Sequence, residues 1–93
     1  MGNILNTEKQ IQQISDEVRD LLVSKNRAYG DSALNPIAVF GNSDPIVSLG
    51  ARIDDKLMRI KNRGITDKTE DTINDLIGYL ILLKIAINNV SNP

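Results

Sequence analysis

The residues best suited to chemistry form two polar strips with helical spacing. Basic residues recur at i, i+4, i+7 and i+11 between positions 52 and 63, so a helix would place them along one side. These residues are Arg52, Lys56, Arg59 and Arg63. A second strip repeats every four residues and consists of Asp71, Asp75 and Tyr79. Arg and Lys bind phosphate oxygens, Arg through its planar fork, so the basic strip indicates an anion-binding edge.

Two interpretations of these strips remain open. In the first, the charges form ion pairs between neighbouring helices, which contribute little to stability when exposed. The pairs that the spacing allows are Asp55 with Arg59, and Asp75 with Arg52 or Lys56. In the second, unpaired cations bind phosphate, while Asp71 and Asp75 accept hydrogen bonds from a base or ribose, or hold a divalent ion. Tyr29 or Tyr79 would then stack on a base.

Three segments position these side chains. Apolar residues recur at helical spacing over about 7–26, 44–63 and 67–88, which predicts an all-α fold of three helices. We expect residues 1–93 to form a single domain whose ends, 1–6 and 89–93, fray.

Capping residues mark the helix ends. The expected N-caps are Thr7 with Gln10 at N3, Ser43 or Asp44 before Pro45, and Asp67 with Glu70 at N3. The expected stops are Gly30 and Gly64. Gly50 lies on the apolar face of the second helix, so close approach of another backbone is expected there.

The connector over 29–43 is long and carries Ala33, Leu34, Ile37, Val39 and Phe40. Long connections in compact domains are often functional, and these apolar residues predict that this one packs over the core. A short helical turn near 36–40 is possible.

The third helix is apolar on more than one side. Its main apolar face is expected to be Ile73, Leu76, Ile77, Leu80, Leu83 and Ile87. A second apolar surface consists of Ile81, Leu82, Ile85 and Ala86. A helix that is apolar nearly all round must be covered, which predicts a helical homo-oligomer with this helix at the interface. The run 80–87 contains Lys84 and is too short to cross a bilayer.

Composition excludes several classes of function. The net charge is −1, which argues against general nucleic-acid binding. Cys and His are absent, which excludes disulfides, thiolate chemistry, His-ligated zinc and His acid–base catalysis. The first residues lack a signal-peptide pattern, so we expect a cytoplasmic protein, in the bacterial host cytoplasm if it is phage-encoded, with no membrane partner.

Three stretches together resemble the nucleotide modification-associated domain 1 family of small α-helical phage and prophage proteins. They are KNRAYGDS at 25–32, RIDDKLMRI at 52–60 and EDTINDLIGY at 70–79. They follow the order K-N-x-x-Y-G, R-x-x-D-K-x-x-R and D-T-x-x-D-L-x-x-Y. The matching positions are Lys25, Asn26, Tyr29, Gly30, Arg52, Asp55, Lys56, Arg59, Asp71, Thr72, Asp75 and Tyr79.

The resemblance implies a role linked to nucleotides. The chain is more distantly similar to MazG-like pyrophosphohydrolases and to small phage oligomers that sequester cyclic nucleotide signals. MazG-like enzymes pair E-x-x-E with E-x-x-D, whereas this chain offers Glu17 with Asp20 and Asp71 with Asp75. The second pair departs from that pattern in spacing and in side-chain length.

We therefore expect a non-enzymatic nucleotide-binding protein, a phage anti-defence sponge for a cyclic or ADP-ribose-derived signalling nucleotide, without a cofactor or a metal. Its expected ligand-binding residues are Lys25, Asn26, Tyr29, Arg52, Asp55, Lys56, Arg59, Asp71, Asp75 and Tyr79. One alternative is a Mg²⁺-dependent nucleotide pyrophosphohydrolase, and another is a helical oligomerisation module.

Overall fold

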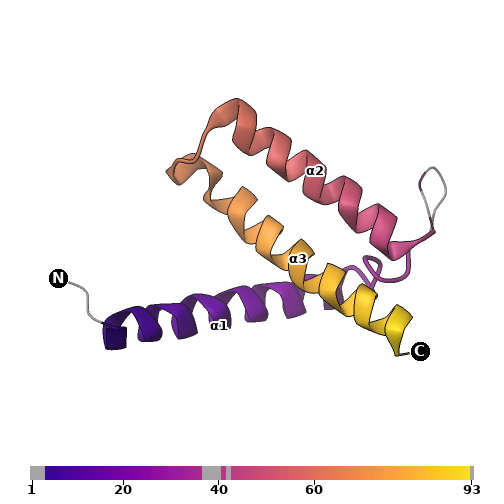
Figure 1. Cartoon of the computed structure of the whole chain (residues 1–93), viewed down its shortest axis with the longest axis horizontal. Coiled ribbons are helices and arrows are strands. Elements are labelled where there is room, and N and C mark those ends of the chain that lie inside the picture. The colour runs from indigo at the N-terminus through magenta and orange to yellow at the C-terminus, as the bar shows by residue number, and fades with distance from the viewer. Residues whose placement is uncertain (1–3, 37–40, 42, 93) are drawn as a thin grey trace.

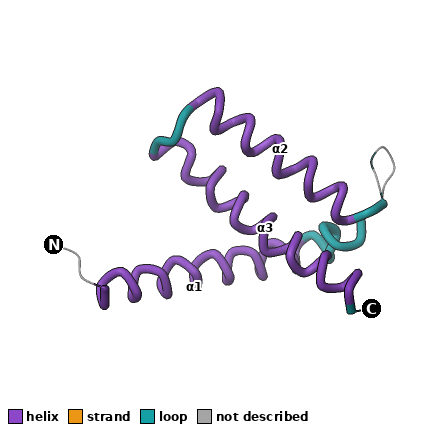
Figure 2. The backbone as a smooth tube through the Cα atoms, in the orientation of Figure 1, coloured by secondary structure: helices purple, strands orange, loops and turns teal. Residues whose placement is uncertain are grey.

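The computed structural model describes residues 4–36, 41 and 43–92, and these residues form helices without a strand. The elements in chain order are α1 (Ile4–Ala28), α2 (Pro45–Arg63), a 3-10 turn η1 (Asp67–Thr69) and α3 (Glu70–Ser91). The predicted all-α class and the three helices are confirmed. Figures 1 and 2 show α2 and α3 side by side as an antiparallel hairpin, with α1 running across α3.

The start and end of α2 are those that the sequence predicts. The Asp44 carboxylate accepts a hydrogen bond from the Ile46 N–H at 2.9 Å, and Pro45 occupies the first turn. Gly64 ends the helix with a φ of 76°, and its N–H donates to the Ile60 carbonyl at 2.8 Å. A positive φ favours glycine, so Gly64 is the residue type that this end requires.

Two predicted N-caps are wrong. The first helix already begins at Ile4, which places Thr7 and Gln10 inside it. Before α3, the capping residue is Thr66 rather than Asp67: its hydroxyl oxygen accepts from the Lys68 N–H at 3.2 Å. Thr69 completes the box by accepting from the Thr66 N–H at 2.9 Å. The capping box therefore begins one residue earlier than predicted, with Thr66 and Thr69 in the places expected for Asp67 and Glu70.

The structure describes parts of both termini at which fraying was expected. Residues 4–6 and 89–91 are helical, as parts of α1 and α3. Positions 1–3 and 93 lie outside the described residues, and so do Ile37, Val39 and Phe40 of the connector. The described part of the connector does pack on the core, through Ala33 and Leu34.

The core sits between α2 and α3. Its buried members are Leu49, Leu82 and Ala86. Partly buried residues around them are Leu22, Ala33, Leu34, Ile46, Tyr79 and Leu83. On α3 the buried stripe is therefore Gly78, Leu82 and Ala86, at i, i+4 and i+8. The sequence placed Leu82 and Ala86 on a secondary surface instead.

Two members of the expected main face of α3, Leu80 and Ile87, are exposed. Small residues explain the difference on α3. Gly78 lets α1 cross closely: a Cβ at this position would lie 3.2 Å from Leu22 Cδ1. The close approach expected at Gly50 is not present among the described residues, since a Cβ there would meet none of their atoms within 4 Å outside its own stretch of helix.

The N-terminal half of α1 projects away from the α2–α3 hairpin (Figure 1). Val18 is the one buried residue of α1. Ile4, Ile11 and Ile14 are more than half exposed. The C-terminal half of α1 is the part that meets α3, and this crossing positions the candidate site.

Candidate functional site: a cationic pocket at the α1–α3 crossing

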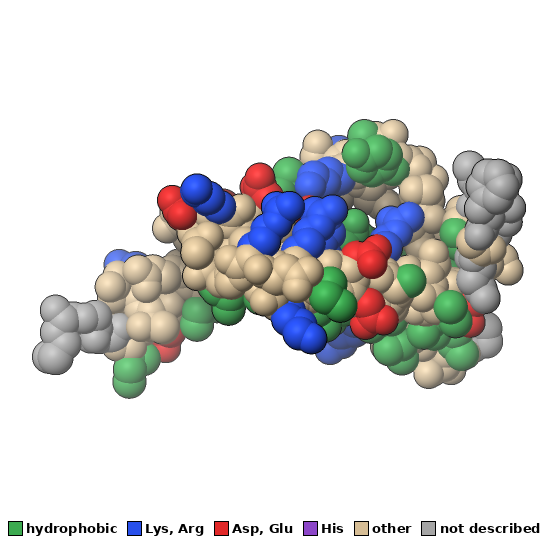
Figure 3. Space-filling model, turned by 90° about the horizontal axis from the view of Figure 1, so that it is seen from above, with side chains coloured by type: hydrophobic (Ala, Val, Ile, Leu, Met, Phe, Trp, Pro, Cys, Tyr) green, Lys and Arg blue, Asp and Glu red, His purple; other side chains and the backbone are tan. Residues whose placement is uncertain are grey.

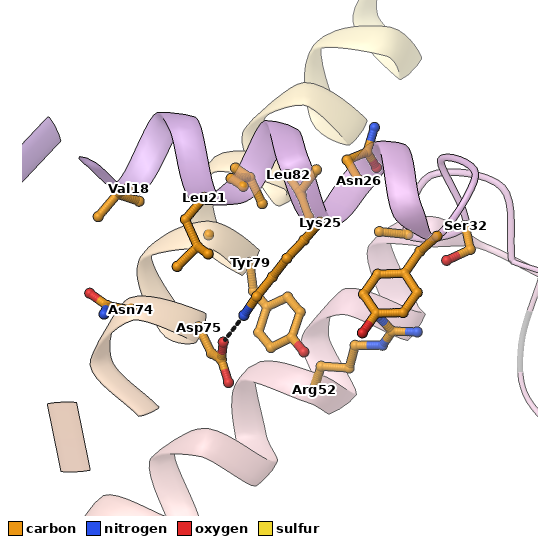
Figure 4. A pocket seen from close by; sticks show the side chains of 14 residues that line it. Val18, Leu21, Lys25, Asn26, Ser32, Arg52, Asn74, Asp75, Tyr79 and Leu82 are labelled. Atoms are coloured by element: carbon orange, nitrogen blue, oxygen red, sulfur yellow. Dashed lines mark hydrogen bonds and ion pairs between the residues drawn. The ribbon is translucent and has the colours of Figure 1, made fainter. Parts of the chain in front are cut away.

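The candidate site is a pocket of about 250 Å³ at the crossing of α1 and α3, closed on a third side by α2 (Figure 4). Its apolar wall consists of Val18, Leu21, Leu22, Ala33, Gly78 and Leu82. Its polar and aromatic lining consists of Lys25, Asn26, Tyr29, Ser32, Arg52, Asn74, Asp75 and Tyr79. One side of the pocket is therefore apolar, and the other carries cations, amides and tyrosines.

Asp75 joins the three helices at this pocket. Its Oδ1 lies 3.2 Å from Nζ of Lys25 on α1, and its Oδ2 lies 3.1 Å from Nζ of Lys56 on α2. Figure 4 shows Lys25 reaching across to Asp75. The predicted pairing of Asp75 with Lys56 is confirmed, while the contact with Lys25 joins residues 50 positions apart and was not predicted.

Partial burial of Asp75 disfavours its charged form and by itself raises the pKa. The hydrogen bonds from Lys56 and Lys25, together with their positive charges, outweigh that effect, so the pKa of Asp75 lies below its ordinary value. Asp75 is therefore ionised at neutral pH.

Arg52 enters the pocket without a carboxylate partner among the residues that the structure describes. Its guanidinium carbon lies 5.9 Å from the centroid of the Tyr79 ring, within the range of cation–π attraction. The alternative pairing of Asp75 with Arg52 does not form, because both Asp75 oxygens contact lysines. A cation held against an aromatic ring at a pocket wall can receive an anion without first giving up a carboxylate.

The last turn of α1 supplies Asn26 to the pocket, and the turn that follows it supplies Ser32. Gly30 and Asp31 both have a φ of 61°, and the Asp31 N–H donates to the Asn26 carbonyl at 3.0 Å. Gly30 therefore follows the end of the helix, as predicted, and adopts the left-handed conformation that glycine favours. The turn then brings Ala33 and Leu34 back over the core.

The structure brings six of the ten predicted site residues to the pocket. They are Lys25, Asn26, Tyr29, Arg52, Asp75 and Tyr79. Lys56 does not line the pocket but forms an ion pair with Asp75, which does. Asp55, Arg59 and Asp71 are exposed and do not line the pocket.

The basic strip does not run along the pocket as a continuous edge. Arg52 alone of its four residues lines the pocket. Arg59 and Arg63 are exposed on α2, and within the described part of the chain neither forms an ion pair, so the expected pair of Asp55 with Arg59 is not present. Figure 3 shows Lys and Arg side chains gathered on the face of the molecule seen from above.

The acidic residues of the magnesium-dependent alternative are not gathered. Glu17 accepts a hydrogen bond from Gln13 at 3.2 Å, and Asp20 pairs with Arg19 at 3.0 Å, both at exposed positions. The Asp20 contact also raises the pKa of Arg19. Among the described residues, no group of three or more acidic side chains could hold a metal ion. Within one chain, Glu17 and Asp20 therefore do not complete a site with Asp71 and Asp75.

Sequence reasoning missed the apolar wall and two polar residues, Ser32 and Asn74. Asn74 adjoins Asp75 in sequence, and Ser32 closes the KNRAYGDS stretch, so both were close to predicted positions. Gly78 could have indicated the apolar wall from the sequence, because a glycine within an apolar helix allows another helix to approach closely.

By length and composition alone, the segment Asp67–Ser91 could cross a membrane. The core helix of a water-soluble protein can pass the same test, so this property does not discriminate between the two environments.

No protein-family model, curated protein or solved structure matches this chain. The resemblance to the nucleotide modification-associated domain 1 family therefore stays a prediction that rests on the three motifs.

Proposed function

We propose that the protein binds a phosphate-bearing nucleotide at the α1–α3 crossing and holds it without chemical change. The observation that carries this proposal is Arg52, a cation that lines the pocket, lies against the Tyr79 ring and has no carboxylate partner among the described residues. A guanidinium group in such a position offers its planar fork to phosphate oxygens.

The rest of the lining fits the other parts of a nucleotide. Lys25 adds a second cation at the pocket, and Asp75 is the one carboxylate among the described lining residues, so that lining carries a net positive charge. The apolar wall and the rings of Tyr29 and Tyr79 offer surfaces on which a base can stack. Asn26 and Asn74 supply amides that can hydrogen-bond to base edges.

The size of the pocket limits what one chain can enclose. Small-molecule sites usually measure about 300–1,000 Å³, and this pocket measures about 250 Å³. One chain can therefore enclose part of a nucleotide, while a ligand with two nucleosides would extend beyond it. This limit supports a homo-oligomer in which other copies complete the enclosure.

The surface area of the chain supports the same proposal. A compact monomer of 10.3 kDa exposes about 5,400 Å², whereas this chain exposes 7298 Å². The excess of roughly 1,900 Å² is more than twice the area that each partner contributes to a standard interface. Its apolar part includes Leu80 and Ile87 on α3 and Ile11 and Ile14 on α1.

The motif resemblance extends the proposal to a class of ligand and a role. It favours a cyclic or ADP-ribose-derived signalling nucleotide and a phage anti-defence sponge. Sequestration requires affinity without turnover, and the described acidic residues form no group of three or more that could hold a metal ion.

A ligand panel tests the proposal. The protein is mixed with linear and cyclic nucleotides, with and without Mg²⁺, and we follow its melting temperature and the integrity of each ligand by chromatography. A rise in melting temperature with intact ligand is the expected result. Mg²⁺-dependent breakdown would indicate the pyrophosphohydrolase, and no shift with any nucleotide would indicate an oligomerisation module.

Arg52→Ala and Arg59→Ala form a matched pair for locating the site. Both remove a guanidinium group from α2, but Arg52 lines the pocket and Arg59 does not. Loss of charge-assisted hydrogen bonds should weaken binding by about 10- to 100-fold in Arg52→Ala, with little change in Arg59→Ala. Equal effects of the two substitutions would place the ligand on the exposed face of α2 instead.

A further inference from the structure

Asp31 has an unusual backbone conformation beside the pocket. It is the one non-glycine residue with positive φ among the described residues, and such residues are uncommon outside functional or tightly constrained positions. Aspartate tolerates this conformation better than most side chains because it can hydrogen-bond locally. The conformation holds only while surrounding contacts maintain it.

Backbone hydrogen bonds hold Asp31 on both sides, and two side-chain amides add to them. Asp31 Oδ1 accepts a hydrogen bond from Asn26 Nδ2 at 3.2 Å, and Asp31 Oδ2 accepts one from Asn35 Nδ2 at 2.8 Å. The first amide belongs to the last turns of α1 and lines the pocket, whereas the second belongs to the connector. The Asp31 carboxylate therefore ties a pocket side chain to the chain that follows it.

The contact with Asp31 decides which end of the Asn26 amide faces a ligand. A primary amide has a donating nitrogen on one side and an accepting oxygen on the other. In Figure 4 the Asn26 nitrogen points away from the side chains of Lys25, Tyr79 and Arg52. Asn26 Oδ1 accepts no hydrogen bond from the described residues, so it is available to the pocket as an acceptor.

Asp75, the carboxylate that lines the pocket, is less suited than Asn26 to accept a hydrogen bond from a ligand. Both oxygens of Asp75 already contact lysine ammonium groups. The other charged residues of the lining, Lys25 and Arg52, are donors only. An N–H group of a ligand is therefore better matched by Asn26 than by Asp75, which the sequence had favoured for this role.

We propose that Asp31 is a positioning residue that fixes the Asn26 amide with its oxygen toward the pocket, so that the site selects a base carrying an amino N–H. This inference rests on the proposed function, since it assigns the base-reading contact within the same pocket. It predicts selectivity rather than overall affinity, because Asp31 itself does not line the pocket.

Nucleotide pairs that differ by one amino group provide the test. AMP is compared with purine riboside 5′-monophosphate, which lacks the 6-amino group, and GMP with inosine 5′-monophosphate, which lacks the 2-amino group. Dissociation constants are measured by calorimetry for the full chain. The wild type should prefer the amino-bearing member of at least one pair by about five- to tenfold, the value of one hydrogen bond.

Asp31→Gly removes the carboxylate while keeping a residue that readily adopts positive φ. It should abolish the preference by weakening the amino-bearing ligand alone. Asp31→Asn keeps both an acceptor for Asn26 and tolerance of this conformation, and should restore the preference. Asn35→Ala removes the other amide from Asp31 but leaves the contact with Asn26, so it should keep the preference even if the turn is less stable.

The ¹⁵N NMR signal of the Asn26 side-chain amide gives a readout that does not require a ligand. In the wild type the proton that Asn26 Nδ2 donates to Asp31 should exchange slowly with water, and in Asp31→Gly it should exchange faster. Unchanged exchange in Asp31→Gly would overturn the positioning role even if nucleotides bind. An equal change in affinity for both members of each pair would overturn the selective role.

Failure of every nucleotide to bind the wild type would refute the proposed function and the ligand selection together. Slow exchange of the Asn26 amide in that case, lost in Asp31→Gly, would show that the positioning contact exists and that the error lies in the ligand. The two failures are therefore distinguishable.

Discussion

Asp75 forms ion pairs with two lysines whose side chains differ in exposure to solvent. The Lys56 side chain is 13% exposed, whereas the Lys25 side chain is 48% exposed. A poorly solvated ammonium group without a counter-ion is costly, while an exposed ion pair contributes little. The stabilising part of this arrangement is therefore the contact between α2 and α3, and the contact with α1 mainly orients Lys25.

Asp75→Asn should destabilise the fold by about 1–3 kcal/mol, because it leaves Lys56 without a carboxylate. The free energy of unfolding in urea measures this effect. Asp71→Asn on the same helix is the matched control: Asp71 is exposed, and its substitution should change stability by less than about 0.5 kcal/mol. Equal effects would mean that Lys56 finds another partner or enough water.

The ion pairs of Asp75 with the two lysines make the stability of the fold depend on pH. The lowered pKa of Asp75 determines the sign of that dependence. In the unfolded chain this carboxyl has an ordinary pKa of about 3.8. Its contribution to stability is complete above that value and is lost as the pH falls through the lower pKa of the folded state. The difference in unfolding free energy between the wild type and Asp75→Asn should therefore shrink below pH 3.8. A difference that stays constant there would contradict the lowered pKa.

At the scale of elements, the two helix glycines have opposite surroundings. A Cβ at Gly50 would meet open space, whereas one at Gly78 would lie 3.2 Å from Leu22 Cδ1 of α1. Gly50 therefore lacks a packing reason that the described residues reveal. Gly78 is the position at which α1 crosses α3.

Gly50→Ala should stabilise the protein by about 0.5–1 kcal/mol, because alanine restricts the unfolded chain and fills no occupied space. Gly78→Ala has the same helix-propensity gain but must displace the end of Leu22, so its net effect should be smaller. Thermal unfolding of the two variants measures the difference. A larger gain at Gly78 would mean that Leu22 moves without cost and that α1 does not depend on this contact.

The sequence predicted the bounds of the helices better than it predicted which helix faces are buried. The bounds of α2 were predicted to within one residue because Asp44, Pro45 and Gly64 act locally on the backbone. The start of α3 was not, because the sequence offers two overlapping capping boxes, and the one that forms uses Thr66 and Thr69 instead of Asp67 and Glu70. The buried stripe of α3 was also missed, because hydrophobicity ranks leucine and isoleucine above glycine and alanine, whereas close packing selected Gly78 and Ala86.

The candidate site could be predicted only in part, because the sequence shows residue types but not how the helices cross. Lys25, Arg52, Asp75 and Tyr79 carry the chemistry, and their residue types show it. Which of the four basic residues would enter a pocket depended on the angle at which α1 crosses α3. The spacing of residues within α2 carries no information about that crossing angle. The sequence therefore could not show that Arg52 lines the pocket and Arg59 does not.

At the scale of the whole molecule, the chain is open. Its radius of gyration is 15.3 Å, compared with about 12 Å for a compact domain of this length. Leu49 is 1% exposed, but Ile4 is 78% exposed. The core is thus concentrated at one end of the molecule, and the projecting half of α1 contributes surface without much burial.

The self-association that we propose should appear as a solution mass that is a multiple of 10.3 kDa, measured by light scattering. Leu80→Arg should reduce that mass while leaving the helical circular dichroism intact, because Leu80 is half exposed on α3. Asn62→Arg adds the same charge at an exposed position of α2 and should leave the mass unchanged. A wild-type protein of monomeric mass would refute the proposed assembly.

The separation of 50 residues between Lys25 and Asp75 has a consequence for the order of folding. The hairpin of α2 and α3 closes over a short connection, whereas docking α1 requires a long loop to close, with a larger entropic cost. We therefore expect α1 to dock last. Because the pocket exists only at that crossing, recognition of a nucleotide would report that the final step of folding is complete.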